Sequence, residues 1–357
     1  MIELTRMQLT NFAAHYVGNK GLGEAILKTD KEFEFKDDFT KNTMVQYLTN
    51  GFKNDIYYQF KPSEVNIYGV KNYIESIFKY KTTFLESSQK IAELLYNQTL
   101  HPKIKGGELY FAYLKEVMVD GVICDAVGIF KSETVDTFIK LDIVPSQNSS
   151  NENESRIITD SGCGLDKLDR GVLIFNTDSE NGYKISIIDK SAKIAEASFY
   201  WTEDFLGVKL KHNAYYHTSH ALNQCVSFCE EVLTNENNVD KKDQLSVLNK
   251  SVNYFKDNDV FDENDFNNHV LQGQDDVIEA FKSHKEKYNQ IHDIKSEDTF
   301  DISKTAVKEK NKYAKSVIKL DKNFHLYIHG RHDLVEKGYD DDKAMGFYKV
   351  YFIHDEM

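Results

Sequence analysis

The chain has 357 residues and a formal net charge of −13, with 41% hydrophobic and 13% aromatic residues. This composition is too apolar for a disordered chain and provides enough side chains for a substantial core. The acidic balance disfavours a protein that binds nucleic acid over its whole surface, because phosphate contacts need clustered Lys and Arg, but it leaves room for a local basic patch.

Membrane and secretory signals are missing from the printed sequence. It has no apolar run of about eighteen residues, and its N-terminal residues lack the apolar stretch of a signal peptide. Four cysteines, Cys124, Cys163, Cys225 and Cys229, are too few for a disulfide framework in a chain of this length. We therefore expect a cytoplasmic protein with reduced cysteines and no membrane contact.

The first hundred residues predict one strand followed by helices. Residues 7–17 have the pattern of a strand, and residues 41–50 and 71–80 are helical candidates. A stronger helix is predicted over 84–99, where apolar residues recur at helical spacing. Pro102 follows it, as is common after a helix C-terminus.

Apolar strands dominate the next segment. Two apolar runs, 109–119 and 122–129, flank Asp120-Gly121, which is a strong hairpin signal. A third strand over 135–143 completes a predicted β-meander. The runs are apolar on both faces, which predicts a sheet covered on both sides.

A polar stretch, 145–155, is predicted to be a loop. Strand patterns at 171–175 and 183–188 then predict a second hairpin, and a helix is expected over about 191–201.

Amphipathic helices are predicted beyond residue 205. Apolar residues step by three and four over 222–233, 245–255 and 277–291, which indicates helices that face a common core. Residues 231–300 contain 16 acidic and 8 basic residues, a net charge of −8. The outer surface of this helical region is therefore predicted to be acidic.

The charge inverts over 303–322, which holds seven lysines against Glu309 and Asp321. If this segment is one helix, five lysines form a ridge that could follow a phosphate backbone. They are Lys304, Lys308, Lys312, Lys315 and Lys319. A solvated face beside an acidic domain explains the same pattern equally well. Strands at 324–329 and 346–353 end the chain.

Two other groups invite a chemical interpretation and have a simpler one. The Lys103–Gly107 segment resembles a phosphate loop, but it follows a helix and opens a strand, so a structural bend is favoured. His212, His217 and His220 precede Cys225 and Cys229. A zinc site there is less favoured than packing, because Cys229 lies on an apolar helix stripe.

The C-terminal end carries the alternative function. His325, His329 and His332 lie near Asp340-Asp341-Asp342 in the sequence, and such a cluster could serve a metal-dependent hydrolase. A partly wet strand face and a solvated turn are the simpler interpretation. The sequence contains no nucleophile elbow, zinc-protease or dinucleotide-binding motif.

Five long segments carry a family resemblance. They are HYVGNKGLGEAI, HPKIKGGELYFAYLKEVMVDGVICDAVGIFKSE, LDKLDRGVLIFN, FYWTEDFLGVK and LDKNFHLYIHGRHDLVEKGYDDDKAMGFYKVYF. Together they resemble bacterial nucleoid-associated proteins of the NdpA type, in the branch found in Bacteroidetes-like bacteria. The resemblance implies a cytoplasmic protein found with the chromosome, without a known enzymatic reaction. It supplies no motif for a catalytic or DNA-contacting residue.

We therefore predict an α+β protein with antiparallel meander sheets, an acidic helical region and a C-terminal strand pair. The predicted segments are an α+β domain at 1–204, the helical region at 205–300, and 301–357, whose strands return to the sheet. The predicted function is non-enzymatic nucleoid association, directly through the five lysines or indirectly through a basic nucleic-acid enzyme. No cofactor or metal is expected, and a homo-oligomer is left open.

Overall fold

The computed structural model describes residues 2–4, 6–52, 56–62, 69–145, 153–190, 200–237, 239–310, 316–320, 322, 324–328 and 334–354. The chain divides into two compact units, Met1–Lys211 and His212–Met357, each with its own apolar core. The sequence suggested three segments, whereas the structure has a single division after Lys211. The reason lies in the second unit, where the C-terminal strands share apolar contacts with the helices.

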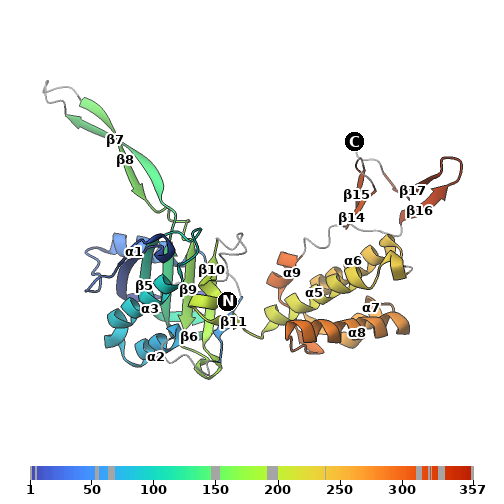
Figure 1. Ribbon diagram of the computed structural model, residues 1–357, viewed down its shortest axis with the longest axis horizontal. Coiled ribbons are helices and arrows are strands. Elements are labelled where there is room, and N and C mark those ends of the chain that lie inside the picture. Colours follow the sequence, from blue (N-terminus) through green and yellow to red (C-terminus); the bar gives the residue numbers. More distant parts are fainter. Residues whose placement is uncertain are drawn as a thin grey trace. The chain divides into compact units, whose positions relative to one another are not determined.

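A nine-stranded antiparallel sheet forms the first unit (Figure 1). The order across it is β11, β4, β10, β9, β6, β5, β2 and β3, and β1 pairs with β5. The strands are β1 (Ile2–Glu3), β2 (Gln8–Val17), β3 (Ile26–Leu27), β4 (Tyr58–Phe60), β5 (Gly107–Val119), β6 (Val122–Ser132), β9 (Arg170–Phe175), β10 (Lys184–Asp189) and β11 (Val208–Leu210). The hairpin around Asp120-Gly121 is confirmed; both residues have positive φ, 48° and 80°, as a two-residue hairpin turn requires.

Apolar cores cover both faces of this sheet. Along β5, Phe111 belongs to one core and its neighbour Ala112 to the other, because successive side chains point to opposite faces. Helices α2 (Val70–Lys79) and α3 (Phe84–Gln98) pack on the first face, and α1 (Asp38–Thr49) packs on the second. The predicted helices and the doubly covered sheet are confirmed.

The predicted third strand of the first meander does not join the sheet. It is β7 (Asp136–Pro145), which pairs only with β8 (Asn153–Gly162) in the described residues. Strand β9 instead pairs with β6 and then forms the predicted second hairpin with β10. Residues 191–199 of the expected next helix lie outside the described residues, and Tyr200–Phe205 is a π-helical segment.

The loop at 101–107 is held by the body of the first unit. The side chain of Asn19, which is fully buried, donates to the carbonyl oxygens of His101 at 2.9 Å and Ile104 at 2.6 Å. Gly107 lies so close to the backbone that a Cβ would stand 1.9 Å from the carbonyl oxygen of Ser132. These contacts confirm the structural interpretation of the two glycines.

Helices dominate the second unit. They are α5 (Ala214–Glu231), α6 (Lys241–Asp257), α7 (Glu263–His269), α8 (Asp275–His292) and α9 (Lys304–Lys310), with a short ladder of β12 (Val260–Asp262) and β13 (Thr299–Asp301). Their apolar stripes meet in a core of aromatic rings that includes Phe228, Phe255, Phe266 and Phe281. The three predicted amphipathic helices are confirmed. Among the described helices, none is long and apolar enough to cross a bilayer.

The C-terminal strands stay within the second unit. Strand β14 (Ser316–Lys319) pairs with β15 (His325–Ile328), and β16 (Val335–Asp340) pairs with β17 (Met345–Val350). In the described residues both ladders have two strands, so the expected return to the large sheet is not observed. The physical reason is that apolar side chains of these strands are already buried within the second unit, where Leu326 and Val335 pack with Leu245 of α6.

Candidate functional site

The predicted lysine ridge is not carried by one helix. Helix α9 ends at Lys310, and the segment is a strand by Ser316–Lys319. Lys312 and Lys315 lie outside the described residues. Lys319 belongs to strand β14, where its backbone is paired with that of His325 in β15. The condition for a continuous helical ridge over 304–319 is therefore not met, although the segment keeps its positive charge.

Lys304 has a structural role at the end of a neighbouring helix. Its Nζ donates to the carbonyl oxygens of Lys256 at 3.1 Å and Asn258 at 2.6 Å, and it pairs with Asp259 at 3.0 Å. These groups lie at the C-terminus of α6, where unsatisfied carbonyls attract a cation. Lys308 is exposed and Lys310 is half-buried. The ammonium group of Lys304 therefore already contacts two carbonyl oxygens and a carboxylate of the protein, without any DNA.

The acidic side chains between residues 231 and 300 lie at the surface of the second unit. None of the sixteen Asp and Glu residues between 231 and 300 is buried. Twelve of them are exposed, namely Glu231, Glu236, Asp243, Asp257, Asp259, Asp275, Asp276, Glu279, Glu286, Asp293, Glu297 and Asp298. The predicted acidic outer surface is confirmed, because the apolar stripes point inward and leave the carboxylates in water.

The C-terminal carboxylates form the solvated turn expected from the simpler interpretation. Asp340 accepts from the backbone N–H of Lys343 at 3.0 Å and pairs with its Nζ at 3.3 Å. Asp341 and Asp342 are exposed in the turn that joins β16 to β17. The described residues hold no group of three or more His, Cys, Asp or Glu side chains suited to a metal. His329, His332 and the side chain of His325 lie outside the part of the chain that the structure describes.

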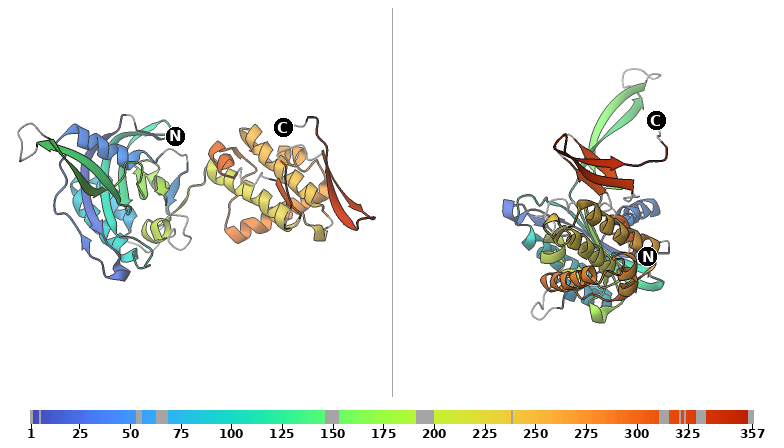
Figure 2. Two further views of the ribbon diagram at one scale, coloured as in Figure 1. Left: turned by 90° about the horizontal axis from the view of Figure 1, so that it is seen from above. Right: turned by 90° about the vertical axis from the view of Figure 1, so that its right-hand side faces the viewer.

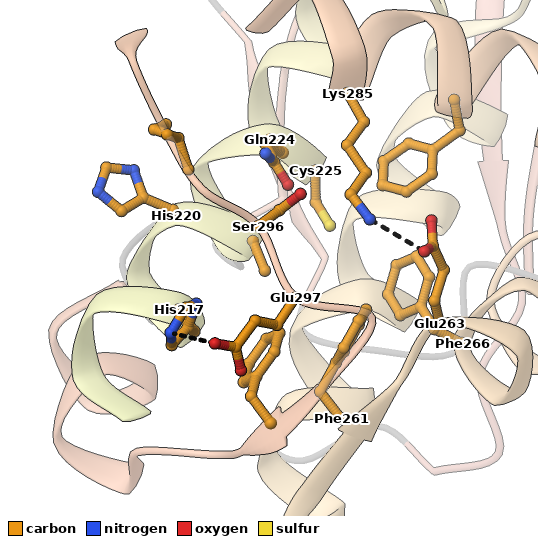
Figure 3. Close-up of a pocket in the computed structure, with 14 residues that line it drawn as sticks. His217, His220, Gln224, Cys225, Phe261, Glu263, Phe266, Lys285, Ser296 and Glu297 are labelled. Carbon is orange, nitrogen blue, oxygen red and sulfur yellow. Dashed lines mark hydrogen bonds and ion pairs between the residues drawn. The ribbon is translucent and has the colours of Figure 1, made fainter. Parts of the chain in front are cut away.

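A pocket in the second unit gathers several of the histidine and cysteine residues that the sequence singled out (Figure 3). It lies among α5, α7 and α8 and the segment 294–300. Lys285 pairs with Glu263 at 2.9 Å, and His217 Nε2 lies 3.6 Å from Glu297 (Figure 3). The cavity is about 20 Å³, which is room for one water molecule and too little for an organic substrate.

Burial favours the neutral forms of the His220 imidazole and the Cys225 thiol in this pocket. Burial, with Lys310 and nearby histidines adding to it, lowers the pKa of His220 to about 4. Burial also raises the pKa of the Cys225 thiol to about 12, so the nucleophilic thiolate is scarce at neutral pH. All four cysteines are free, as expected, and Cys229 is buried in the core. The pocket is therefore a packing feature of the helices.

The sequence reasoning missed a buried ion network in the first unit. Lys131 and Arg170 are almost completely buried, and both contact the carboxylate of Glu133. Arg170 also lies 3.4 Å from Asp189, and its guanidinium sits 4.8 Å from the ring of Tyr200. Charged residues at the end of an otherwise apolar strand were the available signal, because charges are rarely buried unless they are paired.

Lys131 ties this network to the 101–107 loop. Its Nζ donates to the carbonyl oxygen of Lys105 at 2.7 Å and to Glu133 at 2.8 Å. Burial lowers the pKa of Lys131, and the adjacent Glu133 carboxylate opposes that effect. Burial and the charge of Glu133 together raise the pKa of Tyr200. The Tyr200 hydroxyl donates a hydrogen bond to the Glu133 carboxylate at 3.2 Å. All of these contacts position elements of the fold.

Comparison with known proteins identifies the family. A search of curated proteins finds no match. A family model described as "Nucleoid-associated protein YejK" matches residues 14–344, which is nearly the whole chain. This match confirms the resemblance found in the five sequence segments. The chain therefore belongs to the YejK family of nucleoid-associated proteins.

Proposed function

We propose that this chain is a non-enzymatic, cytoplasmic nucleoid-associated protein that reaches chromosomal DNA through a basic, DNA-acting protein partner docked on its acidic helices. Its family membership supports the association with the nucleoid. The observation that favours an indirect route is the exposure of the carboxylates between 231 and 300. An acidic surface repels the phosphate backbone and attracts a basic protein, speeding encounter and favouring correct orientation.

Direct DNA contact is the second candidate. The positive segment at 303–322 supports it, with Lys304, Lys308, Lys312, Lys315 and Lys319 as the proposed contacts. Lys supplies a point charge to phosphate and little base readout, so such contact would not depend on sequence. The ties of Lys304 to Lys256, Asn258 and Asp259 weaken this candidate for that residue.

Charge reversal on α8 tests the indirect route. Glu279 and Glu286 are exposed on this helix, so the double variant Glu279→Lys and Glu286→Lys should fold normally. We expect it to lose co-sedimentation with the nucleoid from lysates. The control variant Glu86→Lys with Glu180→Lys makes the same charge change at exposed positions of the first unit and should still co-sediment. Equal retention by both variants would exclude α8 as the docking surface.

Purified protein and duplex DNA separate the two candidates. The indirect route predicts no mobility shift even at low salt. Direct contact predicts a shift that is lost when Lys304, Lys308, Lys312 and Lys315 are replaced by Glu. If each of these lysines neutralises one phosphate, log K against log salt should have a slope of about −3.6. A shift with that slope would overturn the indirect route.

A further inference from the structure

The β7–β8 hairpin is an arm that leaves the body of the first unit. It is inserted between β6 and β9, which pair directly with each other. Figure 1 and the right-hand view of Figure 2 show the two strands extending away from the nine-stranded sheet. Ten residues of each strand pair in one continuous antiparallel register. The arm is therefore a regular element and has two distinct faces.

One face of the arm carries no charge. Side chains alternate along each strand, and directly opposed residues share a face. The register thus groups Thr137, Ile139, Leu141 and Ile143 with Ser155, Ile157, Thr159 and Ser161. The exposed fractions of the four large aliphatic residues of this face are 75% for Ile139, 61% for Leu141, 63% for Ile143 and 75% for Ile157. We call these eight residues the aliphatic face.

The opposite face is charged. It carries Asp136, Lys140, Asp142, Arg156 and Asp160 together with Phe138 and Ile158. Such a division is typical of a sheet whose apolar side is covered by another surface. A contiguous, exposed aliphatic patch on a soluble protein usually marks an interaction site.

The base of the arm is held firmly. Asp169 accepts from the backbone N–H groups of Glu133 at 2.6 Å and Thr134 at 2.9 Å, and from the Thr134 hydroxyl at 2.7 Å. Lys167 pairs with Asp136, the first residue of β7, at 2.9 Å. The buried contacts of Glu133 with Lys131 and Arg170 lie immediately next to this point. The fold therefore fixes where the arm starts.

Charge argues against nucleic acid as the occupant of the aliphatic face. That face contains no Lys or Arg, and the paired strands as a whole carry four acidic and two basic residues, a net charge of −2. Phosphate contacts need cations, so a DNA-binding role for the arm is disfavoured. A strongly charged protein surface is disfavoured too, because it would lose solvation against aliphatic side chains without gaining a partner charge.

We propose that the aliphatic face binds the same face of a second copy of this chain. The pattern is self-complementary: Leu141 and Ile157 face each other across the strands at the centre, with Ile139 and Ile143 at equal distances on either side. A two-fold axis running across the strands at this level places Leu141 on Leu141, Ile157 on Ile157, and Ile139 of one copy on Ile143 of the other. Such an isologous contact closes after two copies.

The area of the face predicts a weak, reversible dimer. Ten residues per strand, at a rise of about 3.4 Å and with strands about 5 Å apart, give roughly 350 Å² per copy and about 700 Å² for the pair. Stable interfaces bury about 1,200 Å² or more, so this contact falls in the range of transient encounters. Two copies held close together on the nucleoid would associate more readily, because a raised local concentration favours a weak contact.

Sedimentation velocity of the full chain tests the proposal in the absence of DNA and of other proteins, so its result is independent of the proposed function. We expect reversible dimerisation that increases with concentration. The variant Ile139→Glu should weaken it by at least about tenfold in Kd, because the contact would bury a carboxylate without a partner. The matched variant Lys140→Glu, on the charged face of the same strand, should dimerise like the parent chain.

Cysteine cross-linking tests the geometry. Under mild oxidation, Leu141→Cys should yield a covalent dimer, since the two-fold axis brings position 141 of both copies together, whereas Lys140→Cys should not. Unchanged thermal unfolding of Ile139→Glu, expected for a side chain that is 75% exposed, shows that the arm variant is folded. A chain that remains monomeric at every concentration overturns the proposal. Binding of a monomeric chain to neutral lipid vesicles through the aliphatic face also overturns it. Equal cross-linking of the Leu141→Cys and Lys140→Cys variants overturns it as well.

Discussion

In the first unit, Lys131 and Arg170 are buried and pair with Glu133 and Asp189, whereas in the second unit none of the sixteen acidic residues between 231 and 300 is buried. Buried charges in the first unit orient backbone: they join the end of β6, the start of β9 and the 101–107 loop. Exposed charges in the second unit contribute little to the stability of the fold. The charges buried in the first unit are thus structural, whereas the carboxylates exposed between 231 and 300 lie in contact with solvent.

The largest effect should come from breaking the buried network. Arg170→Met removes the cation that faces Glu133 and Asp189, and an uncompensated buried charge typically costs about 3–5 kcal/mol. Urea unfolding should be followed by the fluorescence of Trp201, the only tryptophan, which is buried in the first unit. The control Lys61→Met breaks an exposed pair with Glu203 and should cost less than about 1 kcal/mol. Equal losses would mean that burial does not distinguish the two kinds of charge.

A smaller effect should appear with pH in the first unit. His15 is 4% exposed, its Nε2 lies 3.0 Å from the Ser88 hydroxyl, and burial, with a contribution from Lys28, lowers its pKa to about 4. The unfolded chain, with a His pKa of about 6.5, takes up the proton first as pH falls. The contribution of the neutral His15 to the free energy of unfolding is therefore fully present above pH 6.5. It is lost as the pH falls toward 4, by up to about 2 kcal/mol at pH 5.

The variant His15→Gln isolates this contribution, because glutamine keeps a polar group near Ser88 and does not titrate. Its unfolding free energy, measured by Trp201 fluorescence, should fall less between pH 7 and pH 5 than that of the parent chain. Identical pH dependence in the two proteins would show that folding does not lower the pKa of His15.

The smallest effect should follow the loss of an exposed charge in the second unit. Lys304→Ala removes contacts with Lys256, Asn258 and Asp259, but the lysine is half exposed, so we expect a loss of about 0.5–1 kcal/mol. Circular dichroism of the helices during urea unfolding measures it. Lys308→Ala, one turn further along α9 and exposed, should be close to neutral. A loss above that of Arg170→Met would reverse the comparison between the units.

Local pattern was sufficient for most elements. The Asp120-Gly121 hairpin, the helix that ends before Pro102, and the amphipathic helices at 222–233, 245–255 and 277–291 all follow from turn chemistry and the spacing of apolar residues. The acidic surface also follows from sequence, since helices with one apolar stripe must expose their charges. The family is also recognisable from the sequence, because five long segments resemble it and the family model matches residues 14–344.

Only the tertiary structure shows which strands pair and which surfaces within the chain pack against each other. The 135–143 segment has the pattern of a sheet strand, and only the pairing of β6 with β9 shows that it leaves the sheet as half of an arm. The lysines at 304–319 have helical spacing, yet the segment changes from helix to strand, and Lys304 turns to the end of α6. Spacing in the sequence determines which side chains share a face. Which surface covers that face depends on contacts between distant residues, and these exist only after the chain has folded.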